Sequence, residues 1–244
     1  MNSFLMEIAA EVLSEKDQDT KLPLISVILD RAEQKGTGKW TSQNALDLGI
    51  PIPTIDASVS ARNMSALKDE RVYASTRLKG PPPESVKFTG RFAEDLGDAA
   101  QASTIVSYAQ GFHLMHAASE EYQYDIPFEE VARIWKGGCI IRARLLDSIR
   151  QAYNSTPLIR NPLLDPAIAA TMIGLDSNWR EVVAQANKAG IPTPAIDASL
   201  NYYDSYRSEH LPANMIQGLR DRFGSHGYER TDKQGHYHTN WSGR

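Results

Sequence analysis

The sequence contains little cysteine, no long apolar run and no large excess of one charge. Its single cysteine, Cys139, excludes intrachain disulfides and cysteine-based zinc sites, which fits a reducing, cytoplasmic compartment. No apolar run approaches the roughly 20 residues that span a membrane, and the N-terminus lacks the pattern of a signal peptide. The formal net charge of -4 gives no general attraction to nucleic acid or to an anionic membrane. An anionic ligand therefore requires a local group of basic residues.

A sustained period of two is also missing, and helical periodicity dominates instead. Proline and glycine mark the ends of most helical patterns. We expect helices over the ranges 4–12, 23–34, from Pro53 to the GPPP sequence at 80–83, 90–120, 127–153 with a break at Gly137–Gly138, 163–173, 177–189 with Ser177 as N-cap, 193–207 and 212–223. The predicted fold class is all-α.

One ten-residue sequence occurs twice. GIPIPTIDAS at 49–58 and GIPTPAIDAS at 190–199 agree at eight positions and lie 141 residues apart. In each copy the glycine is expected to end one helix and the second proline to begin the next. Asp56 and Asp197 then lie in the first turn, where a negative charge is favourable. We call these sequences the corner segments and interpret both as structural rather than catalytic.

The same offset of 141 aligns the N-terminal helix with a later one. Phe4, Leu5 and Ile8 fall opposite a second apolar set, Leu145, Leu146 and Ile149. Residues 90–141 precede the second copy, whereas no equivalent segment precedes the first. We therefore expect duplicated helical units of which the first is truncated. Its apolar surface is then covered by a partner, or the chain is the trailing part of a longer protein.

Two groups of basic residues could bind an anion. The sequence QKGTGKWT at 34–41 places Lys35 and Lys39 around two glycines, which allow backbone amides to approach a phosphate. The P-loop spacing is absent, and a helix C-terminus with solvated lysines is the alternative. Arg62 lies among small residues in the helix that begins at Pro53, where it either points into a cleft or makes a surface ion pair.

The second group lies near the C-terminus. Arg220 ends a helical pattern and His226 follows it. Arginine can bind a carboxylate or phosphate through two parallel hydrogen bonds, and a nearby histidine can donate another. The alternative is a pair of cations that stabilise the C-terminus of a helix.

No metal site and no complete catalytic set are predicted. The remaining histidine pairs lack a third ligand at a diagnostic spacing; they are His113 with His116 and His236 with His238. The GxSxG, HExxH and GxGxxG motifs are absent.

The last 20 residues are rich in glycine, histidine and charge, yet they keep Tyr228, Tyr237 and Trp241. Because a frayed terminus seldom keeps its aromatic residues, we expect an ordered tail that packs on a second subunit. A flexible polar terminus is the alternative. The predicted organisation is a helical domain over residues 1–224 and a tail over residues 225–244.

Several long sequences resemble those of the 6-phosphogluconate dehydrogenase family, the decarboxylating enzymes of the pentose phosphate pathway. They are KGTGKWTSQNALDLGIP, SALKDERVYAS, IVSYAQGFHLMHAASEEY, GGCIIRARLLDSI, LPANMIQGLRDRFGSHGYER and a final HTNW. The resemblance extends over essentially the whole chain and implies the family's all-helical C-terminal domain, with its internal duplication. The NADP-binding Rossmann domain, and the segment with the family's catalytic lysine and glutamate, have no counterpart in this sequence.

The resemblance also implies part of a sugar-phosphate site. The family's 6-phosphogluconate-binding residues match Lys35, Arg62, Arg220 and His226, and the last two come from the second subunit of a homodimer. No catalytic residue is implied in this chain, and no residue of the tail can be assigned to the coenzyme. We therefore expect a substrate-binding and dimer-forming part of the enzyme that is inactive alone. The alternative is a non-catalytic helical dimerisation or interaction module that works with a separately encoded N-terminal part.

Overall fold

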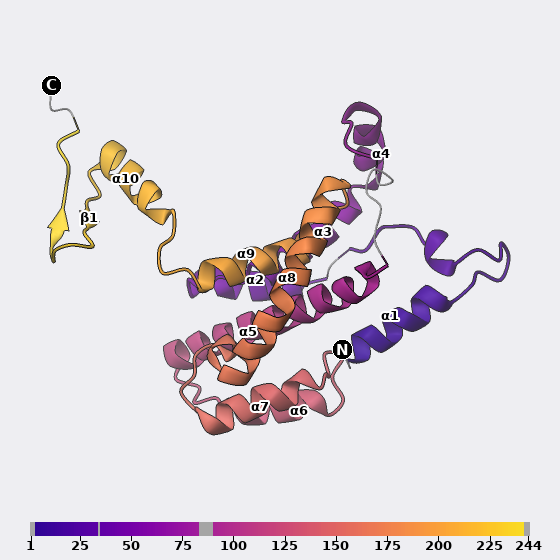
Figure 1. Ribbon diagram of the computed structural model, residues 1–244, viewed down its shortest axis with the longest axis horizontal. Helices are drawn as coiled ribbons and strands as arrows, with labels where there is room; N and C mark the ends of the chain where they lie inside the picture. The colour runs from indigo at the N-terminus through magenta and orange to yellow at the C-terminus, as the bar shows by residue number, and fades with distance from the viewer. Residues whose placement is uncertain (1–2, 34, 83–89, 242–244) are drawn as a thin grey trace. The chain divides into compact units, whose positions relative to one another are not determined.

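The computed structural model describes residues 3–33, 35–82 and 90–241 (Figure 1). Over these residues ten α-helices and one short hairpin are formed, so the predicted all-α class is confirmed. The helices are α1 (Phe4–Ser14), α2 (Thr37–Asp47), α3 (Pro53–Ala66), α4 (Lys68–Arg77), α5 (Phe92–Tyr122), α6 (Phe128–Lys136), α7 (Leu145–Ser155), α8 (Pro166–Lys188), α9 (Pro194–Tyr206) and α10 (Ala213–Gly224). The strands are β1 (Tyr228–Glu229) and β2 (His236–Tyr237), and two 3-10 turns are η1 (Leu24–Ser26) and η3 (Pro162–Leu164).

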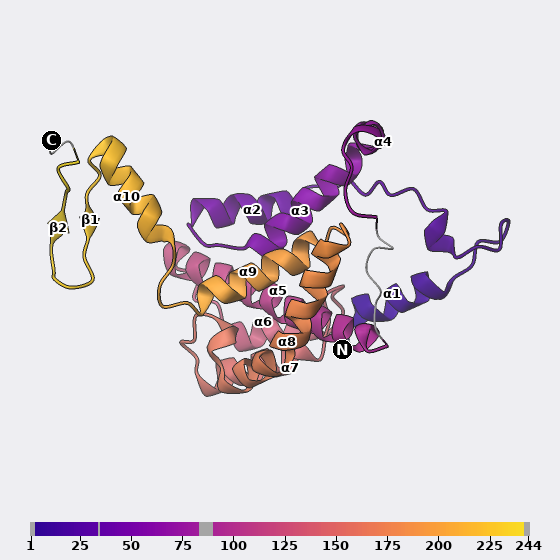
Figure 2. The same ribbon diagram turned by 45° about the horizontal axis from the view of Figure 1, so that its top comes forward.

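The chain divides into two compact units, Met1–Tyr202 and Tyr203–Arg244. In the first unit α5 lies alongside α8, and α6 packs on α7 (Figures 1 and 2). Small side chains on α5, such as Ala99, Ala102 and Ala109, are fully buried and allow close approach of neighbouring helices. Phe112 of α5 lies 5.5 Å from Tyr153 of α7 between ring centroids, so an aromatic contact joins these two helices.

The two corner segments adopt the same backbone geometry. Gly49 and Gly190 both have φ of 66°, a conformation that favours glycine. Each glycine N–H donates to the carbonyl three residues earlier, at 3.2 Å, and the next N–H donates to the carbonyl five residues earlier, at 2.9 Å. This pair of bonds is the Schellman motif, which ends a helix. The predicted corners are confirmed, because α3 and α9 begin at Pro53 and Pro194.

Other helix predictions were wrong. Over residues 23–33, the described part of this range, only the short turn η1 is formed, because Asp30 and Ala32 bond to α3 and α4 instead of forming helical bonds. The long helix after Pro53 is divided at Leu67 into α3 and α4. Ser177 is not an N-cap, since α8 is continuous from Pro166 and Asp165 caps it by accepting from two backbone N–H groups.

The helices α1 and α7 are the two copies predicted from the offset of 141. Each has 11 residues, and each begins and ends at the offset position. They meet at one joint, where the Phe4 N–H donates to the Arg142 carbonyl at 3.1 Å and the Arg142 guanidinium lies 3.7 Å from the Phe4 ring centroid. Their environments differ, because α7 buries Leu146, Ile149, Ala152 and Tyr153, whereas none of the residues of α1, all of them described, is buried.

The second unit contains α10 and the hairpin, which are drawn in yellow tones in Figure 2. Strands β1 and β2 pair antiparallel, with Tyr228 opposite Tyr237. The Tyr228 hydroxyl lies 2.5 Å from the Thr239 hydroxyl, and β1 contacts α10. The tail is therefore ordered through Trp241 and packs on α10 of its own unit. The predicted boundary at residue 224 and the contact with a second subunit stay predictions.

Candidate functional site

The Lys35 segment begins a helix rather than ending one. Gly36 occupies the N-cap position of α2, so the C-cap alternative for this sequence was wrong. The first backbone N–H groups of a helix have no partner within it and, together with the helix dipole, they favour an anion. Lys35 and Lys39 are both exposed at this end. The local chemistry thus suits a phosphate or carboxylate group.

The second glycine of this sequence serves helix packing. A Cβ atom on Gly38 would lie 2.7 Å from Cγ2 of Val59 on α3, so a side chain at this position would force the two helices apart. Ser42 of α2 donates to the Asp56 carboxylate of α3 at 2.6 Å and holds the same pair of helices together. The N-terminus of α2 is therefore positioned by α3, the helix that also carries Arg62.

Arg62 binds backbone carbonyls of the segment that leads to Lys35. Its Nε donates to the carbonyl of Ala32 at 3.2 Å, and Nη2 donates to that of Glu33. Ala32 in turn donates its N–H to Ser65 Oγ at 2.9 Å. Among the described residues the guanidinium thus binds backbone carbonyls rather than forming the surface ion pair of the second alternative. Arg62 therefore fixes the backbone at Ala32 and Glu33, shortly before α2 in the chain.

Arg220 is exposed on α10, and its Nη1 donates to Oε1 of Gln217 at 3.3 Å. His226 follows α10 directly after Ser225, which takes a left-handed conformation with φ of 52°. The exposed His226 ring contacts Phe223 edge-on at 5.9 Å between centroids. Lys35 and Arg62 thus belong to the first unit, and Arg220 and His226 belong to the second.

Sequence reasoning missed a buried carboxylate between Arg220 and Arg222. Asp221 is fully buried and accepts four hydrogen bonds from residues 227–241. Burial by itself would raise its pKa, but the bonds from His238, Thr239, Trp241 and Gly227 outweigh burial and hold the pKa well below its usual range. The RDR sequence indicates a surface ion pair, and only the fold of the tail reveals this acceptor.

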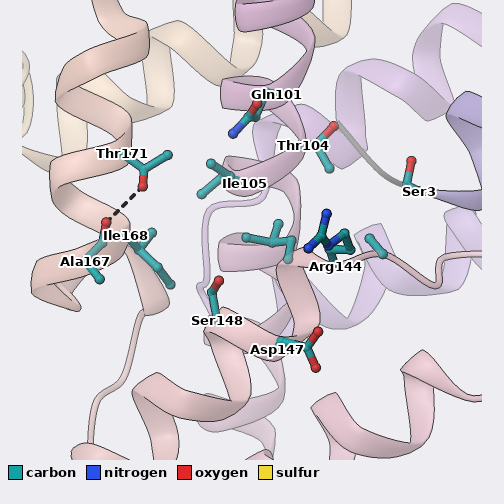
Figure 3. Close-up of a pocket in the computed structure, with 12 residues that line it drawn as sticks. Ser3, Gln101, Thr104, Ile105, Arg144, Asp147, Ser148, Ala167, Ile168 and Thr171 are labelled. Carbon is teal, nitrogen blue, oxygen red and sulfur yellow. Dashed lines mark hydrogen bonds between the residues drawn. The ribbon is translucent and has the colours of Figure 1, made fainter.

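The first unit contains an apolar groove and a more polar cavity. An apolar groove of about 700 Å³ is formed by α2, α5 and α6, with Trp40, Leu114, Trp135 and Ile141 among its lining. A second cavity, of about 520 Å³, lies between α5, α7 and α8 and is lined by polar groups such as Arg144 (Figure 3). None of the four predicted substrate-binding residues lines either cavity.

Within residues 3–33, 35–82 and 90–241 no three His, Cys, Asp or Glu side chains are grouped as metal ligands would be. Among the helices of that same part of the chain, none combines the length and apolar character needed to cross a bilayer.

The duplicated helices, the twin corners and the basic groups at helix ends define an all-helical domain with the local chemistry of an anion site. The chain belongs to the 6-phosphogluconate dehydrogenase family. A family model described as "6-phosphogluconate dehydrogenase, C-terminal domain" matches residues 1–241. The fold and the resemblance predicted from sequence are thereby confirmed.

Similar proteins agree with this assignment. The chain is 50% identical over 245 residues to the NADP(+)-dependent, decarboxylating 6-phosphogluconate dehydrogenase of Bacillus subtilis, covering 99% of this chain and 52% of that protein. It is 48% identical over 241 residues to the decarboxylating enzyme of Escherichia coli K12, with coverage of 99% and 51%. A solved structure of Plasmodium falciparum 6-phosphogluconate dehydrogenase, studied with NADP+ and with 6-phosphogluconate, superimposes with a TM-score of 0.91 at 41% identity and covers 98% and 52% of the two chains. The chain thus spans about half the length of these relatives.

The names of the Bacillus subtilis and Plasmodium falciparum relatives include NADP, and the described residues of this chain form no dinucleotide-binding fold. A dinucleotide-binding fold requires a parallel sheet with a glycine-rich turn at a helix N-terminus. In the part of the chain that the structure describes, the only sheet is one hairpin of two-residue strands.

Proposed function

We propose that this chain is the substrate-binding and dimer-forming part of an NADP-dependent 6-phosphogluconate dehydrogenase, which oxidises and decarboxylates 6-phosphogluconate to ribulose 5-phosphate. The observation that carries the proposal is the placement of the four basic residues. Lys35 lies at the N-terminus of a helix, and Arg220 and His226 are exposed at the end of another. Arg62 holds the segment in front of Lys35 through two backbone carbonyls.

These residues bind and orient the substrate in this proposal. Lys35 and the free N–H groups of α2 supply positive charge and donors to a phosphate or carboxylate. Arg220 offers a planar set of donors, and His226 offers one more. No residue of this chain is assigned to proton transfer or to hydride transfer. Substrate binding without turnover is therefore the expected behaviour of the isolated chain.

Calorimetric titration with 6-phosphogluconate tests the proposed site. The wild-type chain should bind saturably, and Arg220→Ala should weaken binding roughly tenfold or more because a charged donor is lost. Arg222→Ala is the matched control, since Arg222 is exposed on the same helix. Equal weakening by both variants would show a general charge effect, and a wild-type chain without binding would refute the site.

An activity assay tests the expected inactivity. The purified chain, mixed with NADP and 6-phosphogluconate, should produce no reduced coenzyme above a sample without protein. Formation of NADPH in proportion to the concentration of the chain would contradict the proposal.

Dimer formation is supported by the exposed face of α10. Met215, Ile216, Leu219 and Phe223 are 49–74% exposed, and their spacing places them on one side of the helix. We propose that this stripe packs into the apolar groove formed by α2, α5 and α6 of a second copy. A contiguous apolar face of this kind marks an interaction surface, and a closed pair with two equivalent contacts follows from the symmetry of such an exchange.

Light scattering after size exclusion tests the dimer. The wild-type chain should have twice the mass of one chain, whereas Ile216→Asp should shift it to the monomer. Leu158→Asp is the control, because Leu158 is 86% exposed and lies outside both surfaces. A wild-type monomer at micromolar concentration, or a dimer that Ile216→Asp leaves intact, would contradict the proposal.

A second candidate function is a non-catalytic helical interaction module that works with a separately encoded N-terminal part. The observation that favours it is the apolar face of α1, on which Leu5 and Val12 are 45% and 43% exposed. A chain that forms dimers but shows no heat of binding with 6-phosphogluconate would support this second candidate over the first.

A further inference from the structure

The buried side of α10 is polar. Gln217 and Asp221 are separated by four residues and therefore lie on the same face of the helix. Both bond to the segment that follows the helix, whereas the apolar stripe of α10 faces away and is exposed. This is the reverse of an ordinary amphipathic helix. Hydrogen bonds from polar side chains, rather than apolar packing, therefore determine the backbone path of the segment after α10.

The Asp221 carboxylate is fully used by four donors. Its Oδ1 accepts from the Gly227 N–H at 2.9 Å and from His238 Nδ1 at 2.7 Å. Its Oδ2 accepts from the Thr239 N–H at 3.1 Å and from Trp241 Nε1 at 2.8 Å. An ionised carboxylate only accepts, so the His238 proton is on Nδ1. One buried group thereby joins α10 to both ends of the segment 227–241.

The peptide groups after His226 are held from two sides. Gln217 Nε2 donates to the carbonyl of Gly227 at 2.6 Å, while Asp221 accepts from its N–H. Gly227 has φ of 71°, and a Cβ there would lie 2.1 Å from Nε2 of His236. Only glycine fits this position, and the backbone directly after His226 is fixed by Gln217 and Asp221 together.

Gln217 also bonds to the other predicted ligand. Its Oε1 accepts from Arg220 Nη1, so a single amide connects the guanidinium with the Gly227 carbonyl. We propose that Asp221 and Gln217 are positioning residues for the substrate: they hold Arg220 and His226 ready to bind one anionic group. This inference rests on the proposed function, in which Arg220 and His226 contact 6-phosphogluconate, and it adds the two residues that place them.

A simpler role for Asp221 is to keep the tail folded. The two roles differ in what calorimetry measures. Loss of folded molecules lowers the stoichiometry of 6-phosphogluconate binding and leaves the dissociation constant of the remaining sites unchanged. Loss of positioning raises the dissociation constant at unchanged stoichiometry.

The test is a titration with 6-phosphogluconate of variants of the 244-residue chain. Asp221→Asn keeps the shape of the side chain but turns a donor toward groups that need an acceptor, and it should raise the dissociation constant roughly tenfold. Gln217→Met leaves Asp221 and its four donors in place and should raise the dissociation constant several-fold. Tyr237→Phe removes the hydroxyl bond to the Gln234 carbonyl within the hairpin, involves none of the four donors to Asp221, and should change the dissociation constant less than twofold.

The outcomes separate this inference from the proposed function. Weakening by Arg220→Ala with unchanged affinity in both Asp221→Asn and Gln217→Met overturns the positioning role alone. If Asp221→Asn does not fold, Gln217→Met decides. A lowered stoichiometry with an unchanged dissociation constant in each variant also overturns positioning. Unchanged affinity in Arg220→Ala, with weaker binding by Asp221→Asn, overturns the assignment of Arg220 instead, and absence of wild-type binding overturns both.

Discussion

Thr54 and Ser199 lie 145 residues apart in the sequence, yet their buried hydroxyl groups form a hydrogen bond of 3.0 Å. Each residue belongs to one corner segment. Gln110 of α5 completes the arrangement, because its Oε1 accepts from the Thr54 N–H at 3.1 Å and its Nε2 donates to the Thr54 hydroxyl at 2.9 Å. The two corners are thus joined directly through side chains, with the long helix α5 bonded to the first of them.

Replacement of Thr54 by valine should destabilise the first unit. The change preserves shape but removes the buried hydroxyl that accepts from Gln110 Nε2 and bonds to Ser199, which costs about 1–3 kcal/mol of unfolding free energy. Urea denaturation measures this difference. Ser58→Ala is the control, because Ser58 is exposed on the same helix and should alter the unfolding free energy by less than about 0.5 kcal/mol. Equal changes in unfolding free energy for the two variants would show that the buried hydroxyl bond contributes no more to stability than an exposed hydroxyl.

The corner glycines provide a matched pair. Gly49→Ala should cost about 1–2 kcal/mol, the penalty of the left-handed conformation for an L-residue, since a Cβ there meets nothing within 4 Å. Gly190→Ala should cost more, because its Cβ would also lie 3.1 Å from Cγ of Pro81 and 3.2 Å from its carbonyl. Thermal unfolding of both variants checks the order. A larger loss in Gly49→Ala would contradict the described contact with Pro81.

Gly38 and Val59 should show energetic coupling. Alanine favours a helix over glycine by about 1 kcal/mol, but the added Cβ overlaps Val59 Cγ2 and overpacking costs about 1–3 kcal/mol. Gly38→Ala should therefore destabilise the wild-type chain and should be tolerated in a Val59→Ala background. A double-mutant cycle in urea measures the coupling, expected near 1 kcal/mol. Strict additivity of the two changes would argue against close packing of α2 on α3.

Asp30 should make stability depend on pH in the acid range. Hydrogen bonds from Lys68 and Arg71 lower its pKa from 3.8 to about 2. A carboxylate with a lowered folded-state pKa stabilises the protein above the unfolded-state pKa, and this contribution is lost as pH falls. Wild-type chain should lose more thermal stability between pH 4 and pH 2 than Asp30→Asn does. Parallel melting-temperature curves across that interval would contradict the assignment.

Some elements were predictable because their signals are local. The corners follow from glycine and proline at fixed spacing, and the structure places them as predicted. The continuity of α8 was also readable, since Ile168, Met172 and Leu175 begin a buried series at three- and four-residue steps that passes through Ser177 without interruption. This apolar period, rather than the isolated Ser177, decides where the helix begins.

Other features depend on contacts between distant segments. Residues 29–33 give up helical bonds because Arg62, Ser65 and Arg71 satisfy their backbone and side-chain groups. Nothing in the local sequence indicates this. The candidate site shows the same division, since Lys35 and Arg220 stand out as basic residues, whereas the roles of Gln217 and Asp221 become visible only when the tail is folded on α10.

The unequal burial of α1 and α7 has a thermodynamic consequence. An isolated helix of this length is only marginally stable in water, and none of the described residues of α1 is buried. Its opening free energy must therefore be small, while that of α7 approaches the value for the whole unit. Any molecule that covers the apolar face of α1 stabilises it in proportion to the logarithm of its concentration. The two copies of one helical unit thus differ in what determines their stability. Contacts within the chain stabilise α7, whereas the stability of α1 depends on the concentration of a molecule that binds its apolar face.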